Sequence, residues 1–312
     1  MSRVAANDTE GPWTTRRLLQ WTTGFLGERQ VDSARLCAEL LIAHVLECER
    51  TRLYMEADRP ASPTELARLR ELVKRAGAQE PVQYLVGETW FHARSFLVDR
   101  STLIPRPATE TLVGLAVDWA RRRGAPLHML DLCTGSGCIA VSVASALTTP
   151  RKGWAEAPAP PLEVSVVASD LVPAAVDLAR RNAERHGQSG RIEVRVGDLF
   201  AVMQPAERGM FDLITANPPY VSDAEWVQCA PNVRDHEPVT ALRGGPDGLR
   251  LIEPLLRQSP EWLKPGGRLL VEIAASQGAA ARRLASSVKG LRVEDVVRDH
   301  EGHDRVLVVD RL

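Results

Sequence analysis

Four consecutive residues, which we call the tip, have types that could hold a flat polar group: Asn217, Pro218, Pro219 and Tyr220. They follow the short apolar run of residues 211–216, which is typical of a buried strand. Because proline has no backbone N–H and disfavours a helical residue before it, the tip should be stiff and extended. Its carbonyl groups and the Asn217 side-chain oxygen could accept from an NH2 group, and the Tyr220 ring could stack on it. An Asn-Pro turn is the simpler interpretation of the first two residues alone. The whole tip instead predicts a holder for an amide or an exocyclic amine.

A glycine-rich loop after the expected strand 127–132 is a second candidate site. In it, Gly135 permits a tight turn, Gly137 lets the backbone approach a ligand, and Ala140 permits close packing of a helix on the strand. This Gly-x-Gly-x-x-Ala spacing also fits a nicotinamide cofactor, so the spacing alone does not choose between ligands. Asp131, at the end of the strand, would suit a positively charged ligand better than a pyrophosphate.

Two further aspartates follow the next two expected strands. Asp170 is placed to accept hydrogen bonds from two ribose hydroxyls, and Asp198 is placed to accept one from an adenine amine. Each alone could be an ordinary turn or cap residue. Together with Asp131 they stand at successive strand ends, on the edge where open α/β sheets bind their ligands.

The elements that position these residues alternate between strand and helix. Expected strands cover residues 127–132, 164–169, 192–196, 211–216 and 268–273, and expected helices cover 137–147, 173–186, 249–263 and 277–288. Two last strands, 291–298 and 305–310, should form a hairpin that adds an antiparallel edge strand. This order predicts an α/β fold with a doubly wound, mostly parallel sheet. Residues 148–162, rich in Pro and Ala, are predicted to be a surface insertion.

The first part of the chain has a different pattern. Residues 14–80 predict helices, with Thr14 or Thr15, Asp32 or Ser33, and Ser62 as caps. From Pro81 the apolar period changes to two, which predicts a hairpin of strands 83–91 and 95–98. We therefore expect a small all-α domain at 1–82, a β-hairpin linker at 83–105 and a catalytic domain at 106–312. The helical domain offers no catalytic group and is predicted to dock the substrate.

Composition narrows the class of protein. The chain has 312 residues, 44% of them hydrophobic, and a net charge of −1, which fits a globular protein without the basic face of a duplex-binding enzyme. The five cysteines show no paired framework, and no leader or membrane-spanning run is present, which predicts a cytoplasmic location. Cys37, His44 and Cys48 share one face of an expected helix. A buried helix face explains them better than zinc does, so no metal is expected.

The glycine loop, Asp170, Asp198 and the tip together resemble the S-adenosylmethionine-dependent methyltransferases of the Rossmann-like class I. The fuller motif set is similar to that of the peptide-chain release factor glutamine N5-methyltransferases, the PrmC/HemK-like family. That set comprises residues 80–87, 103–107, 233–238, 241–242, 244–249 and 263–267. The likeness extends over about residues 30–310. The tip alone is shared with DNA adenine methyltransferases, whereas segments 103–107 and 233–238 are more selective.

The resemblance implies that S-adenosyl-L-methionine donates a methyl group to the side-chain amide nitrogen of the glutamine in the Gly-Gly-Gln motif of a release factor. S-adenosyl-L-homocysteine would be the product, and the enzyme would act as a monomer without nucleic acid or membrane. It implies cofactor contacts from Asp131, Cys133, Thr134, Gly135, Ser136, Gly137, Asp170, Asp198, Leu199 and Asn217. Substrate binding falls to Asn217, Pro218, Pro219 and Tyr220, of which Asn217, Pro218 and Tyr220 would be catalytic.

Several residues depart from the family pattern and leave alternatives open. Ala108 replaces an acid, Ala274 and Ala275 replace a glycine and an aromatic residue, His236 replaces a tyrosine, and Leu199 replaces a larger side chain. The sister enzyme that methylates a glutamine of a large-subunit ribosomal protein shares much of this pattern. A nucleic-acid adenine methyltransferase would share the tip but should carry a basic channel. A nicotinamide oxidoreductase would leave the tip unexplained.

Overall fold

The computed structural model describes residues 11–149 and 160–312, so most of the predicted 148–162 insertion lies outside the described residues. The chain forms two units. The described residues up to Gly87, together with Pro231–His236, make a helical unit; Glu88–Ala230 and Glu237–Leu312 make an α/β unit. None of the helices in the described part of the chain has the length and apolar content that crossing a membrane requires.

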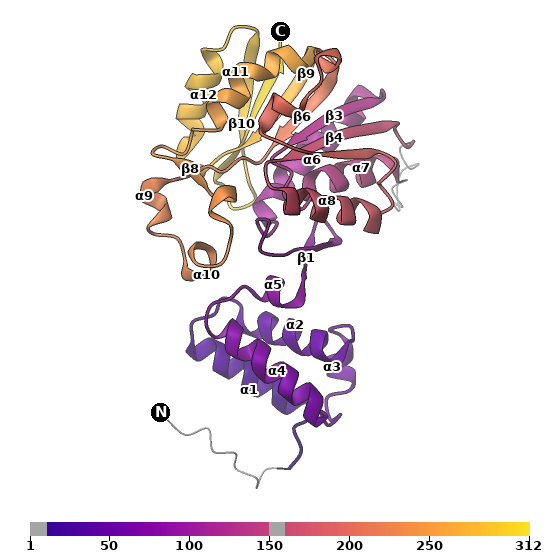
Figure 1. The fold of residues 1–312 in the computed structure, drawn as a ribbon, viewed down its shortest axis with the longest axis vertical. Coiled ribbons are helices and arrows are strands. Elements are labelled where there is room, and N and C mark those ends of the chain that lie inside the picture. Colours follow the sequence, from indigo (N-terminus) through magenta and orange to yellow (C-terminus); the bar gives the residue numbers. More distant parts are fainter. Residues whose placement is uncertain (1–10, 150–159) are drawn as a thin grey trace. The chain divides into compact units, whose positions relative to one another are not determined.

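The helical unit consists of α1 (Thr15–Glu28), α2 (Ala34–Leu46), α3 (Arg52–Met55), α4 (Pro63–Ala76) and α5 (Val82–Val86), with α10 (Pro231–Arg234) from later in the chain (Figure 1). Thr14 caps α1 through the Arg17 N–H, and Ser62 forms a reciprocal capping box with Glu65 at α4, as the sequence predicts. Ser33 precedes α2 but makes no side-chain cap hydrogen bond. The helices bury a core of their own around residues such as Leu26, Leu41 and Ile42.

The predicted strand from residue 83 is wrong in its first half. Val82–Val86 is a short helix, and only Glu88–Phe91 (β1) pairs with Arg94–Leu97 (β2) as an antiparallel hairpin. Val82 and Leu85 are both buried, and this spacing of three is helical rather than alternating. Gly87 ends the helix in the left-handed conformation, at φ 79°, which a glycine adopts without strain.

The α/β unit is built on a seven-stranded sheet in the order β10-β11-β9-β6-β3-β4-β5. Its strands are β3 (Leu127–Leu132), β4 (Val164–Asp170), β5 (Ile192–Val196), β6 (Phe211–Ala216), β9 (Leu263–Glu272), β10 (Leu291–Arg298) and β11 (Asp304–Arg311). Helices α6 (Glu110–Arg123), α7 (Cys138–Thr148) and α8 (Pro173–Arg185) pack on one face. Helices α11 (Ile252–Trp262) and α12 (Gly278–Ser286) pack on the other (Figure 1). The predicted doubly wound fold is confirmed.

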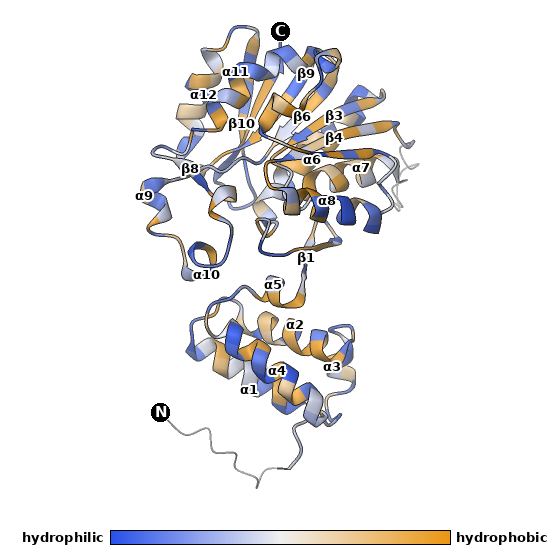
Figure 2. Cartoon of the chain, viewed as in Figure 1, coloured by the Kyte–Doolittle hydropathy of each residue, from blue (hydrophilic) through white to orange (hydrophobic). Residues whose placement is uncertain are grey.

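The direction of the strands follows the prediction, with one difference in detail. Strands β3, β4, β5, β6 and β9 are parallel, and β11 runs antiparallel to both β9 and β10. The antiparallel strand of the terminal hairpin therefore lies between β9 and the edge strand β10. Figure 2 shows the strands of the sheet as predominantly apolar, with hydrophilic residues gathered on outer turns such as those of α8. This pattern is what burial of both sheet faces requires.

Between the tip and α11 the chain forms short elements that the sequence did not reveal. They are β7 (Val221–Ser222), α9 (Asp223–Trp226) and β8 (Arg243–Gly245), where β7 and β8 form a two-stranded parallel pair. Single 3-10 turns occupy Pro107–Thr109, Leu199–Val202, Pro205–Glu207, Val239–Ala241 and Ala275–Gln277. Runs this short have too few residues to show a period.

Candidate active site

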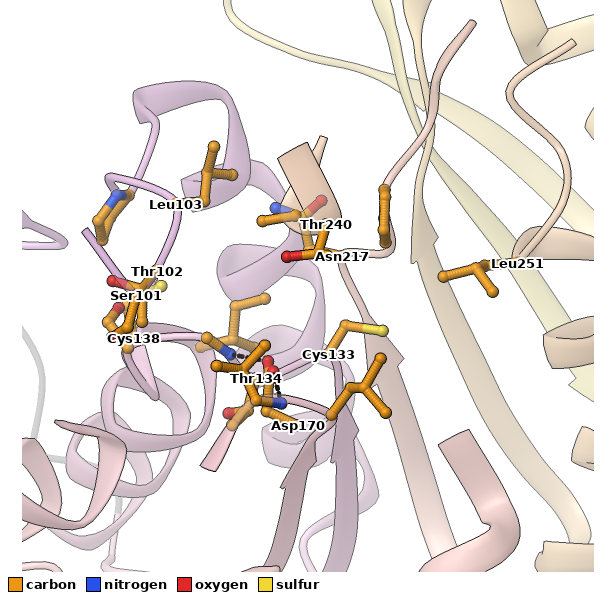
Figure 3. A pocket seen from close by; sticks show the side chains of 18 of the residues that line it. Ser101, Thr102, Leu103, Cys133, Thr134, Cys138, Asp170, Asn217, Thr240 and Leu251 are labelled. Atoms are coloured by element: carbon orange, nitrogen blue, oxygen red, sulfur yellow. Dashed lines mark hydrogen bonds between the residues drawn. The ribbon is translucent and has the colours of Figure 1, made fainter. Parts of the chain in front are cut away.

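A cavity lies at the carboxyl ends of β3, β4, β5 and β6 and encloses about 920 Å³ of space, its open mouth included. Figure 3 shows side chains from several loops turned towards it. Of the residues predicted for the site, the cavity is lined by Cys133, Thr134, Gly135, Ser136, Asp170, Asp198, Leu199, Asn217 and Pro219. Asp131, Gly137, Pro218 and Tyr220 are not among its lining residues.

Asp170 joins the glycine loop to the end of β4. Its Oδ2 accepts from the Gly135 N–H at 2.9 Å and its Oδ1 accepts from the Val172 N–H at 3.0 Å (Figure 3). Each carboxylate oxygen keeps a lone pair for a ligand hydroxyl. Burial raises the pKa of Asp170 from its ordinary value, and the backbone hydrogen bonds oppose that rise. The side chain is thus held in place before any ligand arrives.

Gly137 also has a packing role that the sequence did not indicate. A Cβ at this position would lie 3.2 Å from the Cβ of Ala179, and the residue has φ 79°. The close approach that requires a glycine here is therefore to helix α8. The predicted contact of Gly137 with a cofactor stays a prediction.

Asp131 is buried beneath the loop, with none of its surface exposed. Its two oxygens accept from the hydroxyls of Thr134 and Thr215, both at 2.6 Å, so it ties the loop to β6. Burial raises the pKa of Asp131 to about 6, although both hydroxyls act against the rise. Its predicted contact with the cofactor also stays a prediction.

The raised pKa has a measurable consequence for stability. Asp131 loses its proton near pH 4 in the unfolded chain and at about 6 in the folded one. Between these values the unfolded state binds fewer protons, so stability falls as the pH rises. Asp131→Asn removes this decline. The difference between the free energy of unfolding of Asp131→Asn and that of the unsubstituted protein should therefore increase, by up to about 3 kcal/mol, as the pH rises from about 4 to 7.

Urea unfolding at a series of pH values measures this difference. Asp118→Asn, at an exposed carboxylate of α6, is the matched control and should follow the unsubstituted protein throughout. If Asp131→Asn also follows the unsubstituted protein, then folding does not raise the pKa of Asp131.

The tip leaves two acceptors available. Asn217 donates from Nδ2 to the hydroxyl oxygen of Thr109 at 3.4 Å, which turns its Oδ1 away from Thr109. Within residues 11–149 and 160–312, no hydrogen bond reaches either this Oδ1 or the carbonyl oxygen of Pro218. Asn217 lines the cavity. Asn217 therefore offers an unoccupied acceptor to an NH2 group that enters the cavity.

Tyr220 is anchored rather than free. Its hydroxyl donates to Oε1 of Glu272 at 3.0 Å, and burial raises the pKa of Tyr220 well above its usual range. Its backbone carbonyl accepts from Nε2 of Gln277 at 2.9 Å. Gly248 packs so closely behind the tip that a Cβ there would lie 2.2 Å from this carbonyl oxygen. The glycines of the 244–249 motif thus allow a loop to support the tip from behind.

Glu237 holds the segment that contains Arg106, which lines the cavity. Its carboxylate accepts from the Ile104 N–H at 3.1 Å and from the Arg106 guanidinium, and only 4% of the residue is exposed. Segments 103–107 and 233–238, which contain Ile104, Arg106 and Glu237, belong to the family motifs, but the sequence predicted no site role for these three residues. The sequence prediction also missed several lining residues: Ser101, Thr102, Leu103, Thr109, Thr240 and Leu251. The selectivity of segment 103–107 was an available signal for Leu103, whereas Ser101, Thr102, Thr109, Thr240 and Leu251 lie outside both quoted segments.

The cavity combines features that suit a nucleoside ligand. Asp170 offers acceptors for ribose hydroxyls, and Leu171 and Leu199 offer apolar surface to a flat ring. Ser136 Oγ is buried in the lining and has no hydrogen-bond partner among residues 11–149 and 160–312. Asp198 is exposed at the rim. Among the described residues, no three His, Cys, Asp or Glu side chains gather as metal ligands.

Two protein-family models match the chain. One, described as the PrmC N-terminal domain, matches residues 17–87, and one described as a methyltransferase domain matches residues 125–299.

Three curated proteins, each named release factor glutamine methyltransferase, are similar to nearly the whole chain. That of Rhodopirellula baltica is 37% identical over 98% of this chain and 98% of its own length. That of Geobacter sulfurreducens is 39% identical over 96% of this chain and 98% of its own length. That of Chlorobaculum tepidum is 36% identical over 96% of this chain and 97% of its own length.

Proposed function

This chain belongs to the family of release factor glutamine methyltransferases, and we propose that its cavity brings a methyl donor and the glutamine side chain of a release factor together at the tip. The enzyme is an S-adenosylmethionine-dependent protein glutamine methyltransferase with a class I fold. S-adenosylmethionine supplies a methyl group on a positively charged sulfur, and S-adenosylhomocysteine is the product. The acceptor in this proposal is the glutamine of the Gly-Gly-Gln motif.

The glycine loop and the ends of β4 and β5 hold the methyl donor. Asp170, already oriented by two backbone amides, accepts from the ribose hydroxyls. Leu199 covers the adenine ring, and Asp198 accepts from its amine. Ser136 supplies a buried hydroxyl to the polar end of the donor. Cys133, Thr134 and Gly135 complete this wall of the cavity.

The tip solves the chemical difficulty of an amide nucleophile. The lone pair of an amide nitrogen is delocalised, and removing a proton first is impractical near neutral pH. Asn217 Oδ1 and the carbonyl of Pro218 accept hydrogen bonds from the two N–H groups of the glutamine amide. These hydrogen bonds stabilise the positive charge that develops on the nitrogen. They also aim the nitrogen at the methyl group. The proton leaves after the transfer, and Pro219 holds the geometry.

The observation that carries this proposal is that Asn217, whose Oδ1 accepts no hydrogen bond from the described residues, lines the same cavity as Asp170, with the equally unoccupied carbonyl of Pro218 next to it in the chain. Release factors act at the ribosome, so we place the enzyme in the cytoplasm and propose that it acts as a monomer without direct nucleic-acid contact. Mass spectrometry of a purified release factor after incubation with isotopically labelled S-adenosylmethionine tests the proposal. The label should appear on the Gly-Gly-Gln glutamine and disappear when that residue is replaced. A labelled ribosomal protein and an unlabelled release factor would move the assignment to the sister enzyme.

We further propose that the helical unit selects the release factor, because one side chain cannot distinguish one protein from many. Its surface offers suitable contact residues. Trp21 is 45% exposed and stacks on Phe25 with ring centroids 5.0 Å apart, and Arg29 lies over the Phe25 ring. Tryptophan and arginine are enriched among residues that dominate binding energy at protein interfaces.

Trp21→Ala should therefore raise the KM for the intact release factor by roughly 10-fold or more, the usual effect of losing an interface anchor. Turnover of a short peptide with the Gly-Gly-Gln sequence, a poor substrate in any case, should not change. Steady-state kinetics on both substrates separates the two effects. Glu71→Ala, at an exposed position of α4, is the matched control. Equal losses on peptide and protein would show that Trp21 acts on stability rather than on docking.

A further inference from the structure

Asn182, on helix α8, is a polar residue with none of its surface exposed. Its side-chain amide makes three hydrogen bonds to backbone groups. The Oδ1 atom accepts from the Leu97 N–H at 2.8 Å, and Nδ2 donates to the Leu97 carbonyl at 3.0 Å and to the Ser136 carbonyl at 2.8 Å. Both N–H groups of the amide are therefore used. One side chain thus holds the hairpin strand β2 and the glycine loop at the same time.

The hairpin of β1 and β2 is attached to α8 through side chains of that helix. A two-stranded hairpin is only marginally stable by itself in water. Asn182 bonds both the N–H and the carbonyl of Leu97, as a neighbouring strand would, and so covers an open edge of β2. Arg185, on the same face of α8, donates to Glu88 Oε2 at 2.9 Å and to Ser95 Oγ at 2.8 Å. Of these two attachments, that of Asn182 continues to the glycine loop.

The backbone of the glycine loop needs support at Ser136. This residue stands between Gly135 at φ 54° and Gly137 at φ 79°, and glycines on both sides leave the local backbone free to adopt other conformations. Asp170 fixes the Gly135 N–H on one side of Ser136. The hydrogen bond from Asn182 fixes the carbonyl on the other side. The residue held between these bonds is the one whose buried, unpartnered hydroxyl lines the cavity.

We propose that Asn182 is a positioning residue for S-adenosylmethionine, because it holds Ser136 in place and couples the glycine loop to the hairpin. A planar NH2 group donates in two fixed directions. A displacement of Leu97 that the Asn182 side chain follows therefore weakens the bond to Ser136, and a displacement of Ser136 weakens the bond to Leu97. The inference rests on the proposed function, in which the Ser136 hydroxyl contacts the methyl donor.

Asn182→Ala should raise the Kd for S-adenosylmethionine by roughly 10-fold, because the Ser136 carbonyl loses its buried donor and the loop loses its support. Arg185→Ala is the matched control. It removes contacts between α8 and the same hairpin but none with the loop, so the Kd should stay within about twofold of that of the unsubstituted enzyme. Calorimetric titration measures each Kd, and circular dichroism checks that the fold remains.

A double variant tests whether Asn182 acts through Ser136. Ser136→Ala should itself raise the Kd for S-adenosylmethionine, because it removes the hydroxyl that lines the cavity. If Asn182 acts by holding that hydroxyl in place, Asn182→Ala/Ser136→Ala should raise the Kd by less than the product of the two single effects. Effects that multiply in full would place the action of Asn182 elsewhere and overturn the inference.

Hydrogen exchange tests the coupling from the opposite side, because a coupling between two sites acts equally in both directions. Saturating S-adenosylhomocysteine should slow the exchange of the backbone amides of residues 88–97 in the unsubstituted protein and in Arg185→Ala. In Asn182→Ala the ligand should leave the exchange of these amides unchanged. The result for the unsubstituted protein does not depend on how well Asn182→Ala folds.

Three results contradict the role of Asn182. They are hairpin amides of the unsubstituted protein that do not respond to the ligand, a Kd for Asn182→Ala within about threefold of the unsubstituted value, and an equal rise in Kd for Arg185→Ala. Asp170→Ala separates this failure from that of the proposed function. If Asp170→Ala weakens donor binding and Asn182→Ala does not, only the inference on Asn182 fails. If neither variant changes the Kd, the proposed donor site itself is wrong.

Discussion

Asn217→Ala should lower the turnover number for release factor methylation by about 10²–10³-fold, which is the usual effect of removing one preorganised polar contact to a developing charge. In the proposed site, the substitution removes the Oδ1 acceptor and leaves the glutamine amide with only the Pro218 carbonyl. The Kd for S-adenosylmethionine should remain nearly unchanged, because the main partner of Asn217 is the incoming amide. Single-turnover kinetics with labelled donor, together with calorimetry of donor binding, measures the two quantities separately.

Gln258→Ala is the matched control, since it removes an exposed side-chain amide from α11 and should leave both quantities unchanged. If Asn217→Ala kept activity within threefold of the unsubstituted enzyme, the tip would not hold the amide. A large rise in the Kd for the donor, with unchanged turnover at saturation, would instead assign Asn217 to the cofactor.

Asp170→Ala should weaken S-adenosylmethionine binding by about 10²-fold or more. In the proposed site the carboxylate accepts two charge-assisted hydrogen bonds from the ribose, each worth about 1.5–3 kcal/mol. It also holds the N–H groups of Gly135 and Val172 at 2.9 and 3.0 Å, so its loss loosens the loop that faces the donor. Calorimetric titration gives the affinity, and circular dichroism checks that the fold remains.

Asp170→Asn should bind the donor more tightly than Asp170→Ala, because the amide oxygen still accepts one hydrogen bond. Asp177→Ala, at an exposed acid of α8, is the matched control, with a side chain 72% exposed. An unchanged affinity of Asp170→Ala would reduce Asp170 to a turn residue that organises the loop alone.

Local chemistry made much of this protein predictable. The strand before the tip, the glycine turn and the alternation of strands and helices depend on residues close together in the sequence. Strand β6 is buried along its whole length, as its apolar run indicates. Parallel strands carry their carboxyl ends to one edge, so Asp170, Asp198 and Asn217 meet at one cavity.

Elements with too few residues for a period were not predictable in the same way. Val82–Val86 continued an apolar pattern that was interpreted as a strand, and the packing of Val82 and Leu85 made it a helix. The short elements between the tip and α11 depend on contacts with the tip itself. Gly248, for example, is required by its distance to the Tyr220 carbonyl, which no local pattern expresses.

The sequence by itself determined the fold class, the family and most of the predicted residues that line the cavity, because these follow from local patterns and short motifs. Only the tertiary structure decided what orients those residues. Thr109 is 108 positions from Asn217, and Glu272 is 52 positions from Tyr220. A threonine in a turn and a glutamate at a strand end are ordinary residues in a sequence. Each makes a hydrogen bond to a side chain of the tip, and these contacts exist only once the strands have assembled.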